Sequence, residues 1–448
     1  MDRARKKALD VLIRRTKRGS PLDPLFDVLV MKDPLLTDLD KAFVREIVYG
    51  VMRWQGRLDW VIATYSRISP PKMERVVINI LRMAAYQLLF MDRIPPHAAV
   101  DEGVKLSKMM GKEDAAPFVN GILRGIAEGR KEVPFPDLKA DPINHISAYY
   151  SHPPWLVRRW ITLWGIEETI ALCQANNQIP PFTVRVNTLK GSRIGAIQRL
   201  QDQGVEIKPT HFSPVGLILK DPPQIAPWKF FQEGWFQVQD EASQLVSYIL
   251  GPHAGERVLD ICAAPGGKTT HLAQLMENQG EILAADISQV KLSLLVDNCR
   301  RLGISIVKTQ LFDATSPLPI PPETFDRVLV DAPCTGLGTL RRNPDGKWRV
   351  KEGDITRLQK IQRNILIQAA PMVKSGGVLV YGTCTLTTEE NEEVIEPFLS
   401  EHQEFRLEHT SAFLPPECED LVDRRGYFLT FPHRHDADGF FSVRLRKT

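Results

Sequence analysis

The chain has 448 residues, 43% of them hydrophobic and 25% charged, so it is long enough for two or three folded domains and is not a low-complexity sequence. The net charge is only +3, but residues 1–140 carry 25 Lys and Arg against 18 Asp and Glu. The positive charge therefore gathers at the N-terminal end.

The opening segment MDRARKKALDVLIRRTKRG predicts a basic helix, which can neutralise phosphates of a nucleic acid, although a solvated helix face explains the same charges equally well. No long apolar stretch follows the basic residues, and Asp2 and Asp10 disfavour a transit peptide. No apolar run reaches the length of a membrane span. We therefore expect a cytoplasmic protein that does not associate with membranes.

The six cysteines show no CxxC pair and no regular spacing, which argues against a zinc ribbon and against a disulfide framework. We expect them to be reduced.

Residues 1–140 are predicted to form an all-helical domain. Apolar residues recur every three or four positions in FVREIVYGVMRW and in ERVVINILRMAAYQLLFM. Proline pairs at 70–71 and 95–96 are expected to separate helices. Prolines at 134, 136 and 142, in the stretch that begins at Lys131, indicate a linker.

Residues 141–250 are predicted to form a small mixed α+β unit, with strands at PFTVRVNTL, VEI and GLILK and a helix at SRIGAIQRLQDQG. Residues 251–448 alternate short apolar strands with helices: RVLDICA, EILAADI, FDRVLVDAPC and GGVLVYGTC are the strands. This alternation predicts an α/β fold with a mostly parallel, doubly wound sheet and helices on both faces.

The segment DICAAPGGKTT, Asp260 to Thr270, resembles a phosphate-binding loop at its Gly-Lys-Thr end. Such a loop needs glycine five positions before the Gly of Gly-Lys-Thr, where this chain has Cys262, and the dinucleotide pattern GxGxxG also fails. A strand, a tight glycine turn and a helix N-terminus remain, so we expect the turn to bind a ligand other than a triphosphate.

Asp286 ends the next apolar strand about twenty residues on, where doubly wound sheets place an acid that accepts hydrogen bonds from ribose hydroxyls. A ribose-bearing ligand without a large phosphate charge fits, and S-adenosylmethionine is such a ligand. Asp313 and Asp331 follow the third and fourth apolar segments. Each acid alone is equally well explained as a turn or helix cap, but the ordered series favours a binding site.

Cys334 and Cys384 each lie just beyond an apolar strand. A lone cysteine there is more often buried filler. Two of them, joined to a methyl-donor site and an acid, indicate chemistry. An enzyme that methylates carbon 5 of cytosine, a poor nucleophile, must first add a thiolate to carbon 6. Because the free pKa of a cysteine is roughly 8.5, ionisation needs a nearby cation or helix N-terminus. Thr387 to Glu390, TTEE, predicts a capping box and thus a helix start close to Cys384.

Together these motifs resemble the NOL/NOP/Sun family of RNA cytosine-5 methyltransferases. The segments FVREIVYGVMRW, IPPHAAVDEGVKLSK and FVNGILR are similar to the NusB-type helical domain of the branch that acts on 16S ribosomal RNA, and WFQVQDEAS is similar to the segment leading into the catalytic domain. The resemblance implies a Rossmann-like class I methyltransferase domain after a NusB-like domain.

The resemblance also implies roles for individual residues. Cys384 would be the nucleophile, Cys334 would assist release of the methylated product, and Asp331 would lie between cofactor and base, although the opposite cysteine assignment holds in DNA cytosine methyltransferases. Asp286 would bind ribose and Asp313 the adenine side. The S-adenosylmethionine loop would comprise Cys262, Ala263, Ala264, Pro265, Gly266, Gly267 and Lys268.

The segment NPDGKWR, Asn343 to Arg349, resembles a family loop near the RNA, with phosphate candidates at Arg341, Arg342, Lys347 and Arg349; a solvated loop is the alternative. We expect no metal at His433, His435 and Asp438, because further clustered ligands are lacking.

The expected substrate is 16S ribosomal RNA, unpaired or partly assembled, because the target base must leave its stack to reach a thiol; we expect the protein to act as a monomer. Two alternatives stay open. One is the same chemistry on a tRNA or another ribosomal position, and the other is a non-catalytic RNA-binding or antitermination factor.

Overall fold

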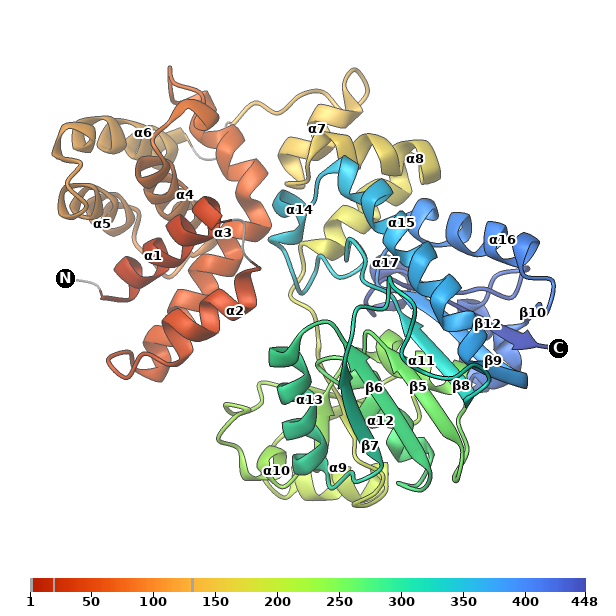
Figure 1. Cartoon of the computed structure of the whole chain (residues 1–448). Coiled ribbons are helices and arrows are strands. Elements are labelled where there is room, and N and C mark those ends of the chain that lie inside the picture. The colour runs from red at the N-terminus through yellow and green to blue at the C-terminus, as the bar shows by residue number, and fades with distance from the viewer. Residues whose placement is uncertain (1–2, 19–20, 130–132) are drawn as a thin grey trace. The chain divides into compact units, whose positions relative to one another are not determined.

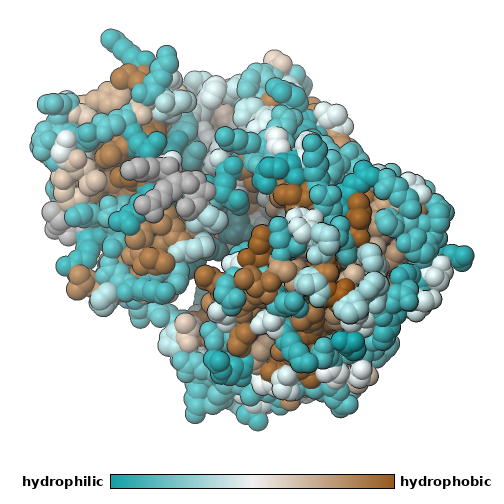
Figure 2. Space-filling model, viewed as in Figure 1, coloured by the Kyte–Doolittle hydropathy of each residue, from teal (hydrophilic) through white to brown (hydrophobic). Residues whose placement is uncertain are grey.

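The computed structural model describes residues 3–18, 21–129 and 133–448 (Figure 1). The chain divides into two compact units. The helical unit comprises Met1–Gln178 and Leu340–Val350, and the sheet unit comprises Ile179–Thr339 and Lys351–Thr448. Hydrophilic surface covers much of the face shown in Figure 2. The predicted domain boundaries at residues 140 and 250 stay a prediction.

The described residues of the helical unit contain helices and turns but no strand. Its α-helices are α1 (Arg3–Arg18), α2 (Leu22–Phe26), α3 (Asp38–Thr64), α4 (Arg75–Phe90), α5 (Pro96–Met109), α6 (Ala116–Gly129), α7 (Pro142–Tyr149), α8 (Pro154–Asn176) and α14 (Gly346–Arg349). A π-helical turn, η1 (Asp27–Met31), and two 3-10 turns, η2 (Pro70–Lys72) and η3 (Glu113–Ala115), connect them. The proline pairs act as predicted: one forms η2 between α3 and α4, and the other starts α5.

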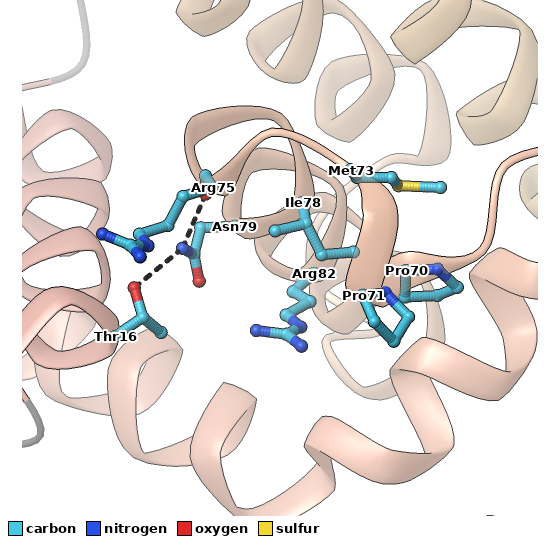
Figure 3. Close-up of a pocket in the computed structure, with 8 residues that line it drawn as sticks. All are labelled: Thr16, Pro70, Pro71, Met73, Arg75, Ile78, Asn79 and Arg82. Atoms are coloured by element: carbon cyan, nitrogen blue, oxygen red, sulfur yellow. Dashed lines mark hydrogen bonds between the residues drawn. The ribbon is translucent and has the colours of Figure 1, made fainter.

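An open cavity of about 310 Å³ lies in the helical unit beside η2 and the first turns of α4 (Figure 3). Its polar side chains already serve the fold: Asn79 Nδ2 donates to the carbonyl of Arg75 at 2.8 Å, and Arg82 donates two hydrogen bonds of 2.7 Å to Asp59. The cavity contains none of the predicted site residues. Its lining consists of Thr16, Pro70, Pro71, Met73, Arg75, Ile78, Asn79 and Arg82.

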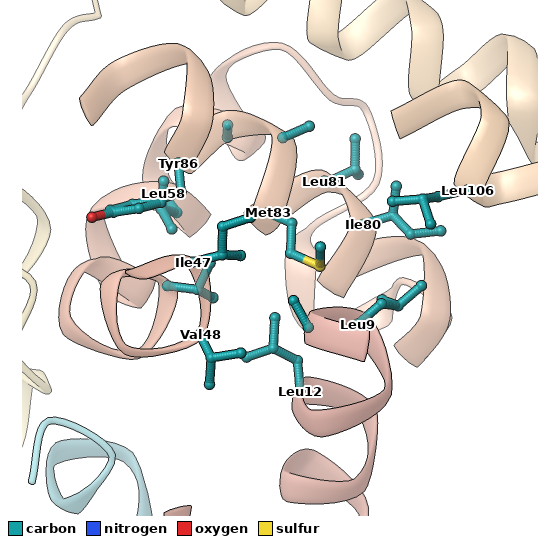
Figure 4. Packing of buried hydrophobic residues seen from close by; sticks show 14 of the residues in the cluster. Leu9, Leu12, Ile47, Val48, Leu58, Ile80, Leu81, Met83, Tyr86 and Leu106 are labelled. Atoms are coloured by element: carbon teal, nitrogen blue, oxygen red, sulfur yellow. The ribbon is translucent and has the colours of Figure 1, made fainter. Parts of the chain in front are cut away.

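The core of the helical unit is built from the apolar faces of α1, α3, α4 and α5 (Figure 4). Side chains spaced three or four residues apart share one face of a helix, which is why the periodic segments of the sequence become buried. Labelled members in Figure 4 include Leu9, Leu12, Ile47, Val48, Leu81, Met83 and Leu106.

The basic N-terminal segment forms helix α1 as predicted, but α1 is also part of this core. Leu9 and Leu12 are completely buried, and the buried Arg15 forms an ion pair of 3.3 Å with Asp345. Lys6 and Arg14 lie on the exposed face. Deleting residues 1–20 would therefore remove core side chains together with the charges, so the role of the charges needs point substitutions.

The segment Leu340–Val350 belongs to the helical unit although it follows the Cys334 motif in sequence. Lys347 is completely buried, and its ammonium donates to the carbonyls of Arg53 and Ser151 at 3.2 and 3.3 Å and to Asn177 Oδ1 at 2.6 Å. Burial lowers the pKa of Lys347 well below its usual value. Trp348 Nε1 donates to the carbonyl of Met52 at 2.7 Å.

This packing corrects the expectation of a phosphate-binding loop. The hypothesis is wrong for Lys347, because all of its side chain is inside the unit, and for Arg341, which is 5% exposed. The Arg349 side chain is 41% exposed, and for Arg342 and Arg349 the phosphate role stays a hypothesis.

The sheet unit begins with a small antiparallel sheet of order β2-β3-β1-β4, which agrees with the predicted mixed α+β region. Its strands are β1 (Phe182–Val186), β2 (Glu206–Pro209), β3 (Gly216–Lys220) and β4 (Phe236–Val238), with helices α9 (Arg193–Gln201) and α10 (Lys229–Gln232).

The second sheet has the order β10-β12-β9-β8-β5-β6-β7, with β11 pairing to β12. The run from β9 to β7 is parallel, and β10, β11 and β12 pair antiparallel. Its strands are β5 (Arg257–Ile261), β6 (Glu281–Asp286), β7 (Val307–Leu311), β8 (Phe325–Asp331), β9 (Val373–Thr383), β10 (Phe405–Glu408), β11 (Phe428–Thr430) and β12 (Phe440–Lys447).

Helices cover both faces of this sheet, because adjacent residues of a buried strand point to opposite sides. Val258 of β5 packs with α11, α12 and α13, whereas its neighbour Leu259 packs with α15 and α16. The helices are α11 (Glu241–Leu250), α12 (Gly267–Leu275), α13 (Gln289–Leu302), α15 (Glu352–Ala369), α16 (Glu392–Glu401) and α17 (Pro432–His435), with 3-10 turns η4 (Ala370–Met372), η5 (Thr388–Glu390), η6 (Thr410–Phe413) and η7 (Pro416–Leu421).

The doubly wound α/β architecture is thus confirmed. The strand order reverses direction at β5, which lies between β6 and β8. Such a reversal opens a crevice at the carboxyl ends of the strands, where this class of fold binds ligands.

Candidate active site

The turn after β5 has a backbone that only particular residues tolerate. Cys262 has φ +65°, and Gly266, which precedes α12, has φ +99°. A Cβ built on Gly266 would lie 2.7 Å from Cγ of Leu295 on α13, so both the conformation and the space require glycine. Gly266 also supplies no side chain to cap α12, which leaves the first amide groups of the helix facing the turn.

Asp260, inside β5, is a buried acid that the sequence analysis did not select. Its Oδ2 accepts the hydroxyl of Thr269 at 2.6 Å, and its Oδ1, also buried, has no hydrogen-bond partner. Burial raises the pKa of Asp260 to about 7. The available signal in the sequence was an acid in the middle of an apolar strand. In the structure, the buried oxygen without a partner lies next to the turn after β5, which indicates that a ligand supplies its hydrogen-bond donor.

Asp286 ends β6 and is 8% exposed. Its Oδ2 accepts the backbone amide of Ala264 at 3.3 Å, and its Oδ1 accepts that of Ser288 at 2.9 Å. The acid therefore holds the start of α13 and the turn from Cys262 to Lys268, which is called the cofactor turn below after its predicted role. Directly beside it, Ile287 and Val290 are 71% and 76% exposed. They place exposed apolar side chains between the end of β6 and the start of α13.

Lys268 and Asp331 join the cofactor turn to the end of β8. The ammonium of Lys268 contacts Oδ2 of Asp331 at 2.8 Å and lies 4.6 Å from the centre of the Phe440 ring. Lys268 is nearly buried, whereas the Asp331 side chain is 30% exposed. One carboxylate oxygen is thus fixed by a cation while the acid can still receive a ligand.

Cys334 and Cys384, 50 residues apart in sequence, have their Sγ atoms 3.2 Å apart. Cys334 follows the end of β8 and Cys384 follows the end of β9, and these two strands are parallel neighbours. The hydrogen bond to Cys384, followed by burial, raises the pKa of the Cys334 thiol well above its usual value. The raised pKa favours the protonated form of Cys334, and either sulfur can donate the hydrogen bond between them.

The predicted capping box after Cys384 is wrong. The turn η5 covers only Thr388–Glu390, and Thr387 makes no side-chain cap. The hydroxyl of Thr387 instead donates to Oε2 of Glu390 at 2.7 Å, and Glu390 is completely buried. The reason is that the carboxylate turns inward to accept several donors from the two cysteine loops, so it is not available to a helix start.

Asp313 lies beyond β7 and is exposed. Its Oδ1 accepts the amide and the hydroxyl of Thr315 at 2.9 and 2.7 Å, and the backbone hydrogen bond keeps the pKa of Asp313 below its usual value. These contacts are those of a turn-capping acid, and its role on the adenine side stays a prediction.

Arg185 is another residue that the sequence analysis missed. This completely buried arginine of β1 donates to the carbonyl of Gly267 at 2.6 Å, to Thr270 Oγ1 at 2.9 Å and to Gln274 Oε1 at 2.9 Å. The small sheet thereby supports the first turns of α12. A basic residue inside the apolar strand TVRVN was the available signal.

Within residues 3–18, 21–129 and 133–448, no group of three or more His, Cys, Asp or Glu side chains is placed to hold a metal ion. Across the same ranges, no helix is long and apolar enough to cross a bilayer.

The site fits S-adenosylmethionine on three observations: the glycine turn leaves unpaired amides at a helix start, Asp260 has an orphaned buried oxygen, and Asp286 follows with apolar side chains beside it. S-adenosylmethionine contains a ribose, an amino group and an adenine ring, which offer hydrogen-bond donors for the acids and an apolar surface for the neighbouring side chains. Fold and site define a class I S-adenosylmethionine-dependent methyltransferase.

Comparisons with known proteins extend this assignment. The family model described as 16S rRNA methyltransferase RsmB/F matches residues 247–446, the NusB family model matches residues 2–128, and the ferredoxin-like domain model of RsmF/B-like methyltransferases matches residues 152–226. The chain is 37% identical over 442 residues to the Bacillus subtilis (strain 168) protein named "Probable ribosomal RNA small subunit methyltransferase B", and the match covers 98% of each.

Two crystal structures are similar over long stretches. PH0851 superposes with a TM-score of 0.83 at 32% identity, covering 98% of both chains. NSun6 from Pyrococcus horikoshii with SFG has a TM-score of 0.58 at 26% identity and covers 66% of this chain and 98% of its own. The chain belongs to the RsmB/F family of ribosomal RNA methyltransferases, in the branch with an N-terminal NusB-type domain.

Proposed function

We propose that this protein transfers a methyl group from S-adenosylmethionine to carbon 5 of a cytosine in 16S ribosomal RNA through a covalent bond between Cys384 and carbon 6. The observation that carries the proposal is the pair of thiols 3.2 Å apart at the ends of adjacent strands, beside an acid that a cofactor-turn lysine holds. The ribosomal substrate is supported by the names of the relatives that match the whole chain.

Cys384 is the nucleophile in this proposal. Its Sγ, as a thiolate, adds to carbon 6 and breaks the double bond between carbons 5 and 6, which makes carbon 5 nucleophilic. The high pKa of Cys334 supports this division of labour. The thiol of Cys334 lies within hydrogen-bond distance of the sulfur of Cys384 and is placed to exchange a proton with it.

Asp331 acts on the ring as negative charge develops in it. In its protonated form the carboxyl group donates a hydrogen bond to N3 and stabilises the charge there; in its ionised form it accepts a hydrogen bond from the exocyclic amine. Lys268 holds one oxygen of the acid at 2.8 Å, so the group is oriented before the base arrives.

S-adenosylmethionine supplies the electrophilic methyl group. The residues that would hold it are those of the turn from Cys262 to Lys268, with Asp260 and Asp286 as acceptors for its donors. Asp313 would contribute on the adenine side.

Release requires Cys334. After carbon 5 carries the methyl group, its remaining proton must leave, the double bond must re-form, and the bond between sulfur and carbon 6 must break. Cys334 passes its proton to the departing sulfur of Cys384 and, as the resulting thiolate, takes the proton from carbon 5 directly or through water. Cys384 then loses its added proton to solvent, which returns both cysteines to their starting protonation states.

The substrate base must be accessible to these thiols. A cytosine in a duplex is stacked and paired, so an unpaired segment or a partly assembled particle is the form that costs least to bind. The alternative is the same catalytic chemistry on a tRNA or another ribosomal position. The experiment described below must therefore include those RNAs among its substrates.

The decisive experiment incubates wild type, Cys384→Ala and Cys334→Ala with labelled methyl donor and unmethylated 16S RNA. Cys384→Ala is expected to lose transfer, by roughly four orders of magnitude or more. Cys334→Ala is expected to accumulate a covalent protein–RNA adduct, because attack proceeds while release fails. Sequencing of bisulfite-treated RNA then locates the methylated cytosine.

Two outcomes contradict the proposal. Transfer that survives in both variants removes covalent catalysis. Loss only in Cys334→Ala, with an adduct trapped in Cys384→Ala, reverses the roles of the cysteines.

A further inference from the structure

Glu390 is a buried acid at the centre of a hydrogen-bond network that the methylation chemistry does not by itself explain. The side chain is completely buried. Its carboxylate accepts the amide and the hydroxyl of Thr335 at 2.8 and 2.5 Å and the hydroxyl of Thr387 at 2.7 Å. Gln362 Nε2 donates to it at 3.0 Å and the hydroxyl of Thr385 at 3.3 Å.

The donors are placed around the two cysteines. Thr335 directly follows Cys334, and Thr385 directly follows Cys384; their hydroxyls are also 2.8 Å apart. Gln362 of α15 donates as well to the carbonyl of Pro333, which precedes Cys334. One carboxylate therefore contacts both cysteine loops and a helix that supports one of them.

A carboxylate suits this position because it only accepts hydrogen bonds, whereas every group around it can donate. A buried anion needs such donors to offset its loss of hydration. Glutamine at the same place keeps the side-chain shape but puts an NH2 group where three threonine hydroxyls now donate. Those hydroxyls must turn round to accept, and each loop contact loses its charged acceptor.

We propose that Glu390 is a positioning residue that holds the Cys334 and Cys384 loops together and so sets the spacing between the two sulfur atoms. The inference rests on the proposed function, in which proton transfer between those sulfurs releases the product. Glu390 reaches neither the base nor the cofactor turn through these contacts, and its effect is transmitted through Thr335, Thr385 and Thr387.

The charge of Glu390 has a second consequence at the same sulfur. It contributes to the high pKa of Cys334, after the hydrogen bond to Cys384, burial and the charge of Cys384. A neutral residue at position 390 therefore shifts the alkylation profile of Cys334 toward lower pH.

The test compares wild type with Glu390→Gln, with Thr387→Val and Thr387→Ser, and with the control Glu393→Gln. Glu393 lies three residues away on α16, is exposed, and accepts Gln359 Nε2 at 3.3 Å. The sulfur spacing is probed with phenylarsine oxide, whose arsenic binds two neighbouring thiols and releases water, and peptide mapping assigns the bridged cysteines.

We expect Glu390→Gln to reduce kcat by about 100-fold without changing the KM for the methyl donor, since small misplacement of reacting groups has effects of this size. Thr387→Val should reduce kcat roughly tenfold, the effect of losing a hydrogen bond to a charged group, and Thr387→Ser should recover most of it. Arsenical bridging of Cys334 and Cys384 should slow in parallel, and Glu393→Gln should match wild type in every assay.

The positioning role is overturned if Glu390→Gln folds and bridges the two thiols at the wild-type rate, or if kcat is unchanged. If Glu390→Gln does not fold, Thr387→Val decides by the same two criteria. Failure of the proposed function looks different: Cys384→Ala would still methylate RNA, whatever the variants at 387 and 390 do.

Discussion

The cofactor turn and the cysteine pair are built in different ways. The turn is formed by residues close in sequence, and its shape depends on the left-handed backbone of Gly266 and on a helix start. The cysteines are 50 residues apart, and their sulfurs meet because parallel strands β8 and β9 end side by side and Glu390 bridges the loops beyond them. The shape of the turn is therefore set by residues adjacent in sequence, whereas the cysteine pair forms only when the sheet unit is folded.

Asp331→Asn tests the residue that connects the two regions, and we expect it to have the largest effect of this series. Asparagine keeps the shape but loses the ion pair with Lys268 and the ability to exchange a proton with the ring. We predict a fall in kcat of about 100-fold, the usual order for removing one group that stabilises developing charge. Single-turnover methyl transfer measures it, and a rate within threefold of wild type would contradict the role of Asp331.

Gly266→Ala should damage the cofactor turn alone. The new Cβ meets Leu295 at 2.7 Å, and a left-handed alanine costs about 1–3 kcal/mol. Donor affinity, measured by calorimetry, should fall by roughly tenfold. Arsenical capture of the two thiols should be unchanged, and a loss of capture would show that the two regions are not built separately.

Asp260→Asn probes pH dependence in the cofactor region. The folded pKa of Asp260 is raised to about 7, so the folded state holds a proton that the unfolded state releases near pH 4. The stability from this group is fully present at low pH and is lost as pH rises from about 4 through 7, with a slope of up to about 1.4 kcal/mol per pH unit. Urea unfolding in the absence of S-adenosylmethionine should show this slope in wild type and not in Asp260→Asn. The same pH dependence in both proteins would contradict the raised pKa of Asp260.

Lys6→Gln combined with Arg14→Gln should have the smallest effect and should leave both regions intact. If these exposed residues of α1 contact phosphates, RNA affinity falls a few-fold and its salt dependence becomes less steep by roughly 1.4 to 1.8 in logarithmic slope. Donor affinity and thiol capture serve as internal controls. If the salt dependence of RNA affinity does not change, Lys6 and Arg14 only solvate the surface of α1.

Much of the fold could be predicted from sequence periodicity. Helices at three- and four-residue spacing, the mixed α+β region, and strands at RVLDICA, EILAADI, FDRVLVDAPC and GGVLVYGTC all lie where the pattern placed them. What the pattern could not show is where a charged side chain ends up. Lys347 was predicted to contact phosphate but is buried. Its segment, Leu340–Val350, packs into the helical unit although its neighbours in sequence belong to the sheet unit.

The sequence alone determined the chemistry that is available: a glycine turn, acids at strand ends and two cysteines, each set by local spacing and residue type. Only the tertiary structure decided which of these groups meet, that Glu390 turns inward between the cysteine loops, and that Asp260 carries an orphaned oxygen. The physical reason is that hydrogen bonding and burial join residues tens of positions apart, and periodicity within a short segment contains no information about such partners.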